Sequence, residues 1–386
     1  MTTWEQARVL AATAVEPVAP VTIGLAAAAG LVLAQDAAAM TDLPATDTSA
    51  MDGWAVAGDP PWRPVGTVLA GQRRPQRLAQ GEAVAIATGA ELPGGVQAVL
   101  RREHAVLAGD ASDGEARLTP APGRGSPAVG CDVRPAGQEC RAGDVVLTAG
   151  DRLGPVALGL LAATGLDEVV VRRVAADVLV LGDELLTRGP ARDGRLRDAL
   201  GPLLTAWLPA WGCGLATRSH VPDTAEALRL ALSGCRGDLV VTTGSTARGP
   251  VDHLHDVLAE LGATLVVDGV EVRPGHPMLL AVLPDGRPLV GLPGNPLAAV
   301  SGLLTLVQPV LQALGGAAAT VPRRAALAVD VGAGDEATRL VPVRQGRPVL
   351  YAGPGMLRGL TLADAVAVVP PGGVAAGQDV VLLDLP

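Results

Sequence analysis

The chain has 386 residues, more than one hydrophobic core usually serves, so two to four domains are expected. Hydrophobic residues make up 49% and charged residues 18%, a globular composition that excludes a disordered chain. The formal net charge of −9 gives no long-range attraction for nucleic acid or anionic membranes, so neither is expected as a partner.

Three further features of the composition bear on chemistry and location. Lysine is absent, so every fixed cation is an arginine. The four cysteines (Cys131, Cys140, Cys213 and Cys235) lack CxxC spacing, which favours unpaired thiols in a reducing compartment over zinc or disulfides. No run reaches the roughly 18 apolar residues of a spanning helix, and the first ten residues lack a signal pattern, so a cytoplasmic location is expected.

The first part of the chain is predicted to be helical and then β-rich. Residues 3–14 have an apolar face, and residues 21–33 form a second amphipathic run, so both are predicted helices. From about residue 43 to residue 133, short Val and Leu runs among Pro and Gly predict β structure, with strands at 81–87 and 97–101.

The chain then returns to mixed structure. Residues 109–130 are rich in Gly, Pro and Asp, which predicts hairpins and loops. A strand at 145–147 and a helix at 154–164 follow. A β-rich insert between such segments indicates that the N-terminal helices and residues near 134–172 form one discontinuous unit.

The third region alternates between buried strands and helices, the pattern of a doubly wound sheet. Strands are predicted at 177–181, 238–241, 264–267 and 289–292. Helices are predicted at about 196–211, at 225–232 after the capping pair Asp223 and Thr224, and at 297–314. After Pro322 a small β unit is predicted, with strands at 325–331, 338–343, 348–351, 365–369 and 380–383.

Three Gly-containing segments follow strands of this predicted sheet: GDELL at 182–186, TTGST at 242–246 and GLPGNP at 291–296. Ligands of open α/β sheets bind beyond the carboxyl ends of the strands. Backbone N–H groups and helix N-termini there suit phosphate, and the carboxylates of Asp183, Glu184 and Asp252 suit Mg²⁺. Each segment alone could be a helix cap, a solvated acid or a rigid turn, whereas together they favour a cleft for a phosphorylated ligand with a hard cation.

Two turns in the β-rich region also carry polar residues. They are MDGW at 51–54 and TGAELP at 88–93. By themselves both are ordinary hairpin turns, and their local sequence does not indicate whether they lie near the cleft.

These motifs together resemble one known family, the molybdopterin molybdenumtransferases of the MoeA and gephyrin E-domain type. TSAMDGWAV at 48–56 is similar to the family's SAMDGYAV, and ATGAELPGGVQAVLRRE at 87–103 to its TGAxxPxGADAVVxxE. The segment VRPAGQECRAGDVVLTAGDRL at 133–153 resembles the family's segment that leads from the β insert back to the first domain. LGDELL, TTGSTARGPVD, VRPGHP and GLPGNP follow in the family's order, so the resemblance covers essentially the whole chain.

The resemblance implies a multidomain α/β plus β protein with four domains. They are a discontinuous dimerisation domain (1–42 and 134–172), a β-rich insert (43–133), a doubly wound α/β molybdopterin-binding domain (173–318) and a C-terminal β domain (319–386). It also implies a reaction that joins molybdate to adenylylated molybdopterin with Mg²⁺ and releases AMP. In the implied homodimer, Asp52 and Thr88 of one subunit face the α/β cleft of the other. Molybdopterin adenylyltransferase and apo-molybdoenzymes are the implied protein partners.

The family's site residues carry over position by position. Those implied in catalysis retain the family's residue type: Asp52, Thr88, Glu184, Asp223 and Asp252. Glu184 and Asp252 are also the expected Mg²⁺ ligands. The residues expected to bind the pterin substrate and the oxyanion are Gly182, Asp183, Thr243, Gly244, Ser245, Arg248, Gly249, Arg273, Pro293, Gly294, Asn295, Pro296 and Arg339.

Several positions depart from the family's pattern, mostly on the cationic side of the site. Arg273 and His276 stand where the family has lysines in KPGKP, and another lysine of the family aligns with Gly269. Ala247 replaces a serine, while Leu200 and Pro354 replace an asparagine and part of a glycine-serine pair. A lost cation weakens an oxyanion site by about 1–3 kcal/mol, and Arg248 is a candidate for compensation.

These departures leave an alternative to the active enzyme. A degenerate paralogue would bind molybdopterin or a partner protein without turnover. A third interpretation, a pyrophosphatase-type enzyme that shares the α/β domain, is disfavoured by the segment at 48–56, by GLPGNP and by the C-terminal β unit.

Overall fold

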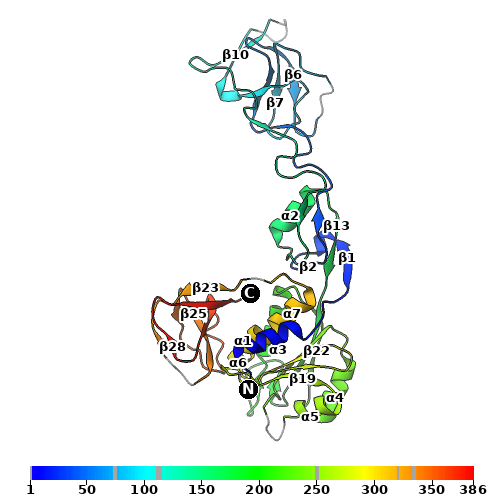
Figure 1. Cartoon of the computed structure of the whole chain (residues 1–386), viewed down its shortest axis with the longest axis vertical. Helices are drawn as coiled ribbons and strands as arrows, with labels where there is room; N and C mark the ends of the chain where they lie inside the picture. Colours follow the sequence, from blue (N-terminus) through cyan, green and yellow to red (C-terminus); the bar gives the residue numbers. More distant parts are fainter. Residues whose placement is uncertain (1, 73–75, 110–114, 248–251, 320, 333–335) are drawn as a thin grey trace. The chain divides into compact units, whose positions relative to one another are not determined.

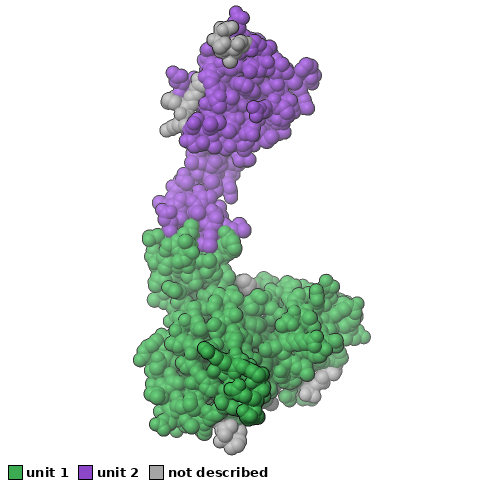
Figure 2. All heavy atoms as spheres, turned by 180° about the vertical axis from the view of Figure 1, so that it is seen from behind, with its two compact units in different colours: residues 1–35, 148–155, 168–386 green, residues 36–147, 156–167 purple. Residues whose placement is uncertain are grey.

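The computed structural model describes residues 2–72, 76–109, 115–247, 252–319, 321–332 and 336–386 (Figure 1). The chain forms two compact units. Unit 1 comprises residues 1–35, 148–155 and 168–386, and unit 2 comprises residues 36–147 and 156–167 (Figure 2). Each unit is described by itself below.

The centre of unit 1 is a six-stranded sheet in the order β17-β14-β18-β22-β21-β19. Its strands are β14 (Ala175–Leu181), β17 (Gly214–Val221), β18 (Leu239–Thr243), β19 (Thr264–Asp268), β21 (Leu279–Val282) and β22 (Pro288–Leu292). Pairs β14–β17, β14–β18 and β18–β22 are parallel, and β21 runs antiparallel to both of its neighbours. The predicted α/β sheet is confirmed, while β17 and β21 were not predicted.

Helices cover both faces of this sheet, and each face has its own apolar core. On one face lie α1 (Trp4–Thr13), α3 (Leu200–Ala210) and the run from α6 (Pro296–Gly302) through the π-helical segment η4 (Leu303–Val307) to α7 (Gln308–Gly315). On the other lie α4 (Ala225–Gly234) and α5 (Leu254–Glu260). The helical run over residues 296–315 is long and apolar enough to cross a membrane, but 83% of its apolar window is buried against unit 1.

The helix starts show why these segments form where they do. Thr3 and Gln6 make a capping box at α1, and the Thr224 hydroxyl accepts the N–H of Ala227 at the start of α4, as predicted. The helix predicted from residue 196 starts only at Leu200. Residues 196 and 197 instead form β16 (Leu196–Arg197), which pairs with β15 (Leu185–Leu186).

One predicted helix was wrong. Residues 21–33 form β1 (Pro20–Gly24), the short 3-10 turn η1 (Leu25–Ala27) and β2 (Val32–Leu33), in a three-stranded sheet with β13 (Glu168–Arg172). The β-branched residues Val21, Thr22 and Ile23 pair with Val171, Val170 and Val169. This cross-strand pairing of β-branched side chains outweighs the helical periodicity of the segment.

The chain ends in a second sheet of unit 1, in the order β20-β25-β27-β29-β23. Its strands are β20 (Val272–Arg273), β23 (Arg323–Ala326), β25 (Thr338–Arg344), β27 (Ala365–Val369) and β29 (Asp379–Asp384), with β26 (Arg347–Pro348) on β25 and the pair β24 (Val331–Gly332) and β28 (Gly373–Val374) nearby. The predicted terminal β unit is confirmed. Because β20 precedes β21 in the chain, its pairing with β25 connects the two six-stranded sheets of unit 1.

Unit 2 is built on a four-stranded sheet in the order β6-β7-β5-β8, which confirms the predicted β-rich region. Its strands are β5 (Gly53–Ala57), β6 (Arg63–Val68), β7 (Glu82–Ile86) and β8 (Ala98–Arg101). A turn η2 (Arg102–His104) leads to the hairpin of β9 (Ala105–Ala108) and β10 (Arg117–Pro120). Two short pairs, β3 (Ala37–Ala38) with β12 (Val145–Leu147) and β4 (Thr48–Ser49) with β11 (Val133–Arg134), and the predicted helix α2 (Pro155–Ala163) complete it.

Candidate functional site

A cavity of about 420 Å³ lies at the carboxyl ends of the parallel strands of unit 1. The chain leaves β14 towards β17 on one side and later returns to β18 on the other, so this is the switch point where α/β sheets bind ligands. We call it the strand-end cavity. Its lining includes the following predicted residues: Glu184, Thr243, Gly244, Gly294, Asn295 and Pro296.

The turn after β14 holds an exposed carboxylate over a glycine. Gly182 has a φ of +137°, and a Cβ atom built there would lie 2.7 Å from Oε2 of Glu184. Any side chain at this position would therefore push the Glu184 carboxylate away. The next N–H, that of Asp183, donates to Oδ2 of Asp223 at 3.0 Å, which brings the segment after β17 beside the turn after β14.

The turn after β18 leads towards Asp252. Ser245 has a left-handed backbone, with φ +57°, and its Oγ accepts the N–H of His253 at 2.9 Å. This bond holds the residue next to Asp252 against the strand end. Arg248 and Gly249, both predicted to contact the pterin, lie outside the described residues.

The turn after β22 opens α6, but part of its predicted phosphate cradle is already used. The N–H groups of Leu297 and Ala298 both approach the carbonyl oxygen of Pro354, at 2.8 and 3.3 Å. These two donors are therefore satisfied within the chain. What this turn offers to a ligand is chiefly the side chain of Asn295.

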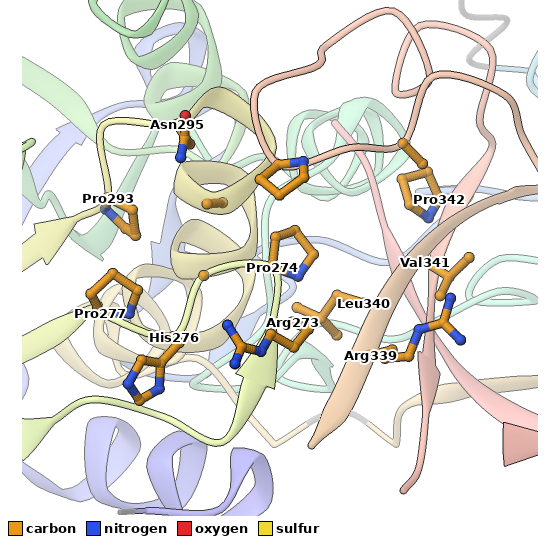
Figure 3. Close-up of a pocket in the computed structure, with 14 residues that line it drawn as sticks. Arg273, Pro274, His276, Pro277, Pro293, Asn295, Arg339, Leu340, Val341 and Pro342 are labelled. Atoms are coloured by element: carbon orange, nitrogen blue, oxygen red, sulfur yellow. The ribbon is translucent and has the colours of Figure 1, made fainter. Parts of the chain in front are cut away.

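A second cavity, of about 410 Å³, lies between the two six-stranded sheets of unit 1 (Figure 3). We call it the arginine cavity. It is lined by Arg273, His276 and Arg339, together with several prolines and aliphatic residues. Asn295 lines both cavities, so they adjoin.

The two arginines are neighbours by strand register. Arg273 of β20 is the Cα partner of Arg339 of β25, and the two strands are parallel, so both side chains are on the same face. One nitrogen of Arg339, Nη1, donates to the carbonyl oxygen of Gly332 at 2.9 Å. The described lining of the cavity contains no Asp or Glu. Both arginines thus add positive charge to one cavity, which favours an anion there.

The loop that carries these cations depends on a close backbone approach. Gly275 has a φ of +117°, and a Cβ atom there would lie 2.9 Å from the side chains of Met278 and Ser301 and 3.1 Å from the carbonyl oxygen of Ala298. The position between Arg273 and His276 is thus reserved for glycine.

Unit 2 holds the remaining predicted pair, Asp52 and Thr88. Oδ1 of Asp52 accepts both the N–H of Thr88, at 2.7 Å, and its hydroxyl, at 2.9 Å. These two bonds, the backbone one above all, lower the pKa of the Asp52 carboxyl. Antiparallel pairing of β5 with β7 brings the two residues together from 36 positions apart. The result is an exposed carboxylate that is ionised at neutral pH.

Some residues of the strand-end cavity were not predicted. Asp198 is only 7% exposed, lines the cavity and accepts the N–H of Gly201, in the first turn of α3, at 2.8 Å. An Asp near a helix start was the available signal, but the helix was predicted to begin at residue 196, before Asp198. Gly355 and Leu357 also line this cavity, and no local pattern connects them with it.

A metal site made entirely of protein ligands is not present in the part of the chain that the structure describes, where no three His, Cys, Asp or Glu residues are grouped to hold one. Mg²⁺ commonly takes only one or two carboxylates and completes its shell with phosphate oxygens and water. The exposed carboxylate of Glu184 fits that mode.

Comparisons with known proteins agree with this architecture. Residues 2–165 match the family model described as MoeA N-terminal region (domain I and II), and residues 177–313 match the probable molybdopterin binding domain. A molybdopterin molybdenumtransferase of Synechococcus elongatus is 34% identical over 302 residues, covering 73% of this chain and 72% of the relative. One from Staphylococcus epidermidis is 29% identical over 394 residues, covering 94% and 91%.

A solved structure extends the similarity to the whole chain. The molybdopterin biosynthesis moea protein from Pyrococcus horikosii is 26% identical, covers 99% of both chains and superposes with a TM-score of 0.74. By its two matched regions, and by its identity to the Synechococcus relative over nearly three quarters of its length, the chain belongs to the molybdopterin molybdenumtransferase family.

Proposed function

We propose that this protein inserts molybdenum from molybdate into adenylylated molybdopterin, with Mg²⁺, and releases AMP. The observation that carries the proposal is that the strand-end cavity and the arginine cavity adjoin at Asn295. The first offers glycine turns and a carboxylate for a phosphorylated pterin, and the second offers paired cations for an oxyanion. A transferase that joins these two substrates needs both sites side by side.

The pterin substrate is assigned to the strand-end cavity. Thr243, Gly244 and Asn295 line its walls, and Leu181, Leu196 and Leu200 supply apolar surface for a flat ring. Glu184, with Asp252, would hold Mg²⁺ against the phosphates of the substrate, where the ion would neutralise their charge. Asp223 positions the Asp183 turn through its hydrogen bond to the Asp183 N–H.

Molybdate is assigned to the arginine cavity. Arg273 and Arg339 present guanidinium groups from neighbouring strands, and guanidinium donors match the oxygens of a tetrahedral oxyanion. Tungstate has the same charge and shape, so this cavity does not distinguish the two metals by electrostatics alone.

Asp52 and Thr88 are proposed to complete the site from the second subunit of a homodimer. The Asp52 carboxylate, held in place by its hydrogen bonds from Thr88, would orient the reacting groups or accept a proton from them. An unpartnered apolar helix supports the dimer: the sequence of α2 is apolar throughout, yet Leu161 is its one buried residue and Val156 is 86% exposed. The cytoplasm is the proposed location, with the adenylyltransferase that makes the substrate and apo-molybdoenzymes as partners.

The second candidate function is binding of molybdopterin or of a partner protein without turnover. Two observations favour it: Leu200 makes the strand-end cavity more apolar than an asparagine would, and Pro354 occupies two N–H groups of α6. Against it stands the retention of all five residues implied in catalysis, from Asp52 to Asp252.

Release of AMP decides between the two functions. Purified protein is incubated with adenylylated molybdopterin, Mg²⁺ and molybdate, and AMP is quantified with molybdate, with tungstate and without oxyanion. The proposed function requires AMP release that depends on both Mg²⁺ and the oxyanion. Tight pterin binding with no AMP release under any of these conditions would establish the binding role instead.

A further inference from the structure

His276 is the one histidine in the described lining of the arginine cavity, and histidine is the residue type that commonly serves as a charge switch near neutral pH. Its Nδ1 atom lies 3.0 Å from the carbonyl oxygen of Val270. A carbonyl oxygen can only accept a hydrogen bond, so Nδ1 carries a proton. In the neutral ring, Nε2 therefore presents a lone pair.

Nε2 is the ring nitrogen that a ligand can reach. No described residue forms a hydrogen bond with it. An unpartnered ring nitrogen is either buried or accessible to solvent, and Nε2 is not among the buried ones, so solvent has access to it. The nearby Gly269 leaves this ring edge uncovered. A Cβ atom built on Gly269 would lie 3.5 Å from Cε1 and 4.0 Å from Nε2 of the ring.

The charge state of the ring decides which ligands suit it. Molybdate and tungstate are dianions at neutral pH, and all their oxygens accept hydrogen bonds. A neutral ring opposes such an oxygen with the Nε2 lone pair, whereas the imidazolium donates a charged hydrogen bond to it. We infer that His276 is a specificity residue of the arginine cavity, which accepts a tetrahedral dianion strongly only after its Nε2 is protonated. This inference rests on the proposed oxyanion cavity.

The charges around His276 make ligand binding and proton uptake interdependent. Arg273 and Arg339 line the same cavity and carry fixed positive charges (Figure 3). Among nearby acids, Asp268 of β19 pairs with Nε2 of His255, and neither Glu271 nor Glu5 of α1 lines the cavity. A dianion bound there attracts both arginines and a protonated ring. At a pH where the free ring is neutral, binding should therefore take up about one proton per anion.

Molybdate titration calorimetry on the full-length protein tests this directly. Titrations run from about pH 6 to about pH 8.5, on both sides of the ordinary imidazole pKa of about 6.5, and in two buffers with different ionisation enthalpies. The wild-type protein should lose on the order of tenfold in affinity across this range, as for one charged hydrogen bond. Its apparent enthalpy should differ between the buffers by the amount expected for proton uptake.

Three variants isolate the role of the ring. His276→Lys supplies a permanent cation, so it should bind with little pH dependence and without proton uptake. His276→Gln should bind as weakly at low pH as the wild-type protein does at high pH. His220→Gln changes an exposed histidine on β17 and should behave as the wild-type protein does. Melting temperatures confirm that each variant is folded.

Failure of the inference and failure of the proposed cavity give different results. If Arg273→Ala binds molybdate as the wild-type protein does at every pH, the arginine cavity is not the oxyanion site, and the role of His276 fails with it. If Arg273→Ala weakens binding but His276→Gln keeps the wild-type pH profile and proton uptake, the cavity stands and the inference about His276 is overturned.

Discussion

At the scale of single residues, Asp52 and Thr88 show how a site is made from unremarkable turns. Each residue alone follows the pattern of a hairpin turn, and neither turn implies the other. The pairing of β5 with β7 brings them into contact, and the two hydrogen bonds from Thr88 keep Asp52 ionised. What distinguishes the pair is thus a property of two strands together.

Asp52→Ala is expected to lower AMP release by about a hundredfold or more, the usual contribution of a group that transfers or orients a proton. Because Asp52 is exposed, the melting temperature should change little. Thr88→Ser, which keeps the hydroxyl donor, is the matched control and should retain most of the activity. Equal loss in both variants would indicate that this turn has only a structural role.

At the scale of elements, the backbone between β20 and β21 requires a glycine near the site. It carries Arg273 and His276, and Gly275 between them packs against α6 with no room for a Cβ atom. The sequence contains this glycine, but only the tertiary structure explains it, through its φ of +117° and its packing against Ala298 and Ser301.

Gly275→Ala should therefore destabilise the protein by about 1–3 kcal/mol, the range for a strained backbone position, and weaken molybdate binding because Arg273 and His276 on either side of it shift. Urea unfolding and molybdate calorimetry measure the two effects. Gly286→Ala is a useful contrast: it also has a positive φ, +86°, but no atom lies within 4 Å of its Cβ position. If the two variants behave alike, backbone strain alone accounts for the loss and the tight packing does not.

A buried carboxylate joins three elements near the amino ends of the parallel strands of the α/β sheet, away from the strand-end cavity. Asp177 of β14 is fully buried and accepts the Thr217 hydroxyl of β17 at 2.5 Å and the N–H groups of Arg236 and Gly237, before β18, at 2.7 and 2.6 Å. Burial raises its pKa, but these hydrogen bonds outweigh that effect, and the pKa is lowered overall.

Since the folded pKa of Asp177 lies below its unfolded value of about 3.9, its contribution to stability is present above that pH and is lost as the pH falls through the folded pKa. Asp177→Asn should reduce the free energy of unfolding by about 1–3 kcal/mol at pH 7, and its deficit should shrink in acid. Urea unfolding near pH 7 and below about pH 4 measures both. The exposed Asp193→Asn is the control, and an equal deficit at both pH values would contradict this account.

At the scale of the whole molecule, the residues implied in catalysis are divided between the two units. Glu184, Asp223 and Asp252 belong to unit 1, and Asp52 and Thr88 belong to unit 2. The proposed homodimer would unite them, and the exposed apolar surface of α2 supports it.

Val156→Asp is expected to weaken the dimer, since it places a charge on α2, and to lower AMP release in proportion to the dimer lost. Sedimentation velocity over a range of protein concentrations measures the association. Val321→Asp alters another valine that is 93% exposed and lies outside α2, so it should change neither property. A Val156→Asp protein that is still a dimer at low concentration would exclude α2 from the interface.

Sequence alone was sufficient for the alternating architecture of unit 1, for the β-rich region and for the family. Buried strands and capped helices leave strong local signals, as at β14 and at Thr224 before α4. It failed at residues 21–33, where pairing of β1 with β13 competes with a helical pattern of similar strength. Segments whose sequence shows no clear apolar pattern, such as β17, were missed for the same reason. Their structure depends on neighbours that are distant in the chain.

The composition, the order of the motifs and the residue types at the strand ends were thus determined by the sequence itself. Only the tertiary structure decided that Arg273 and Arg339 are register partners, that Pro354 caps α6 and that two cavities adjoin at Asn295. The physical reason is that local signals reflect interactions over a few residues. Cavities and their charges arise where strands and loops from distant parts of the chain pack against one another.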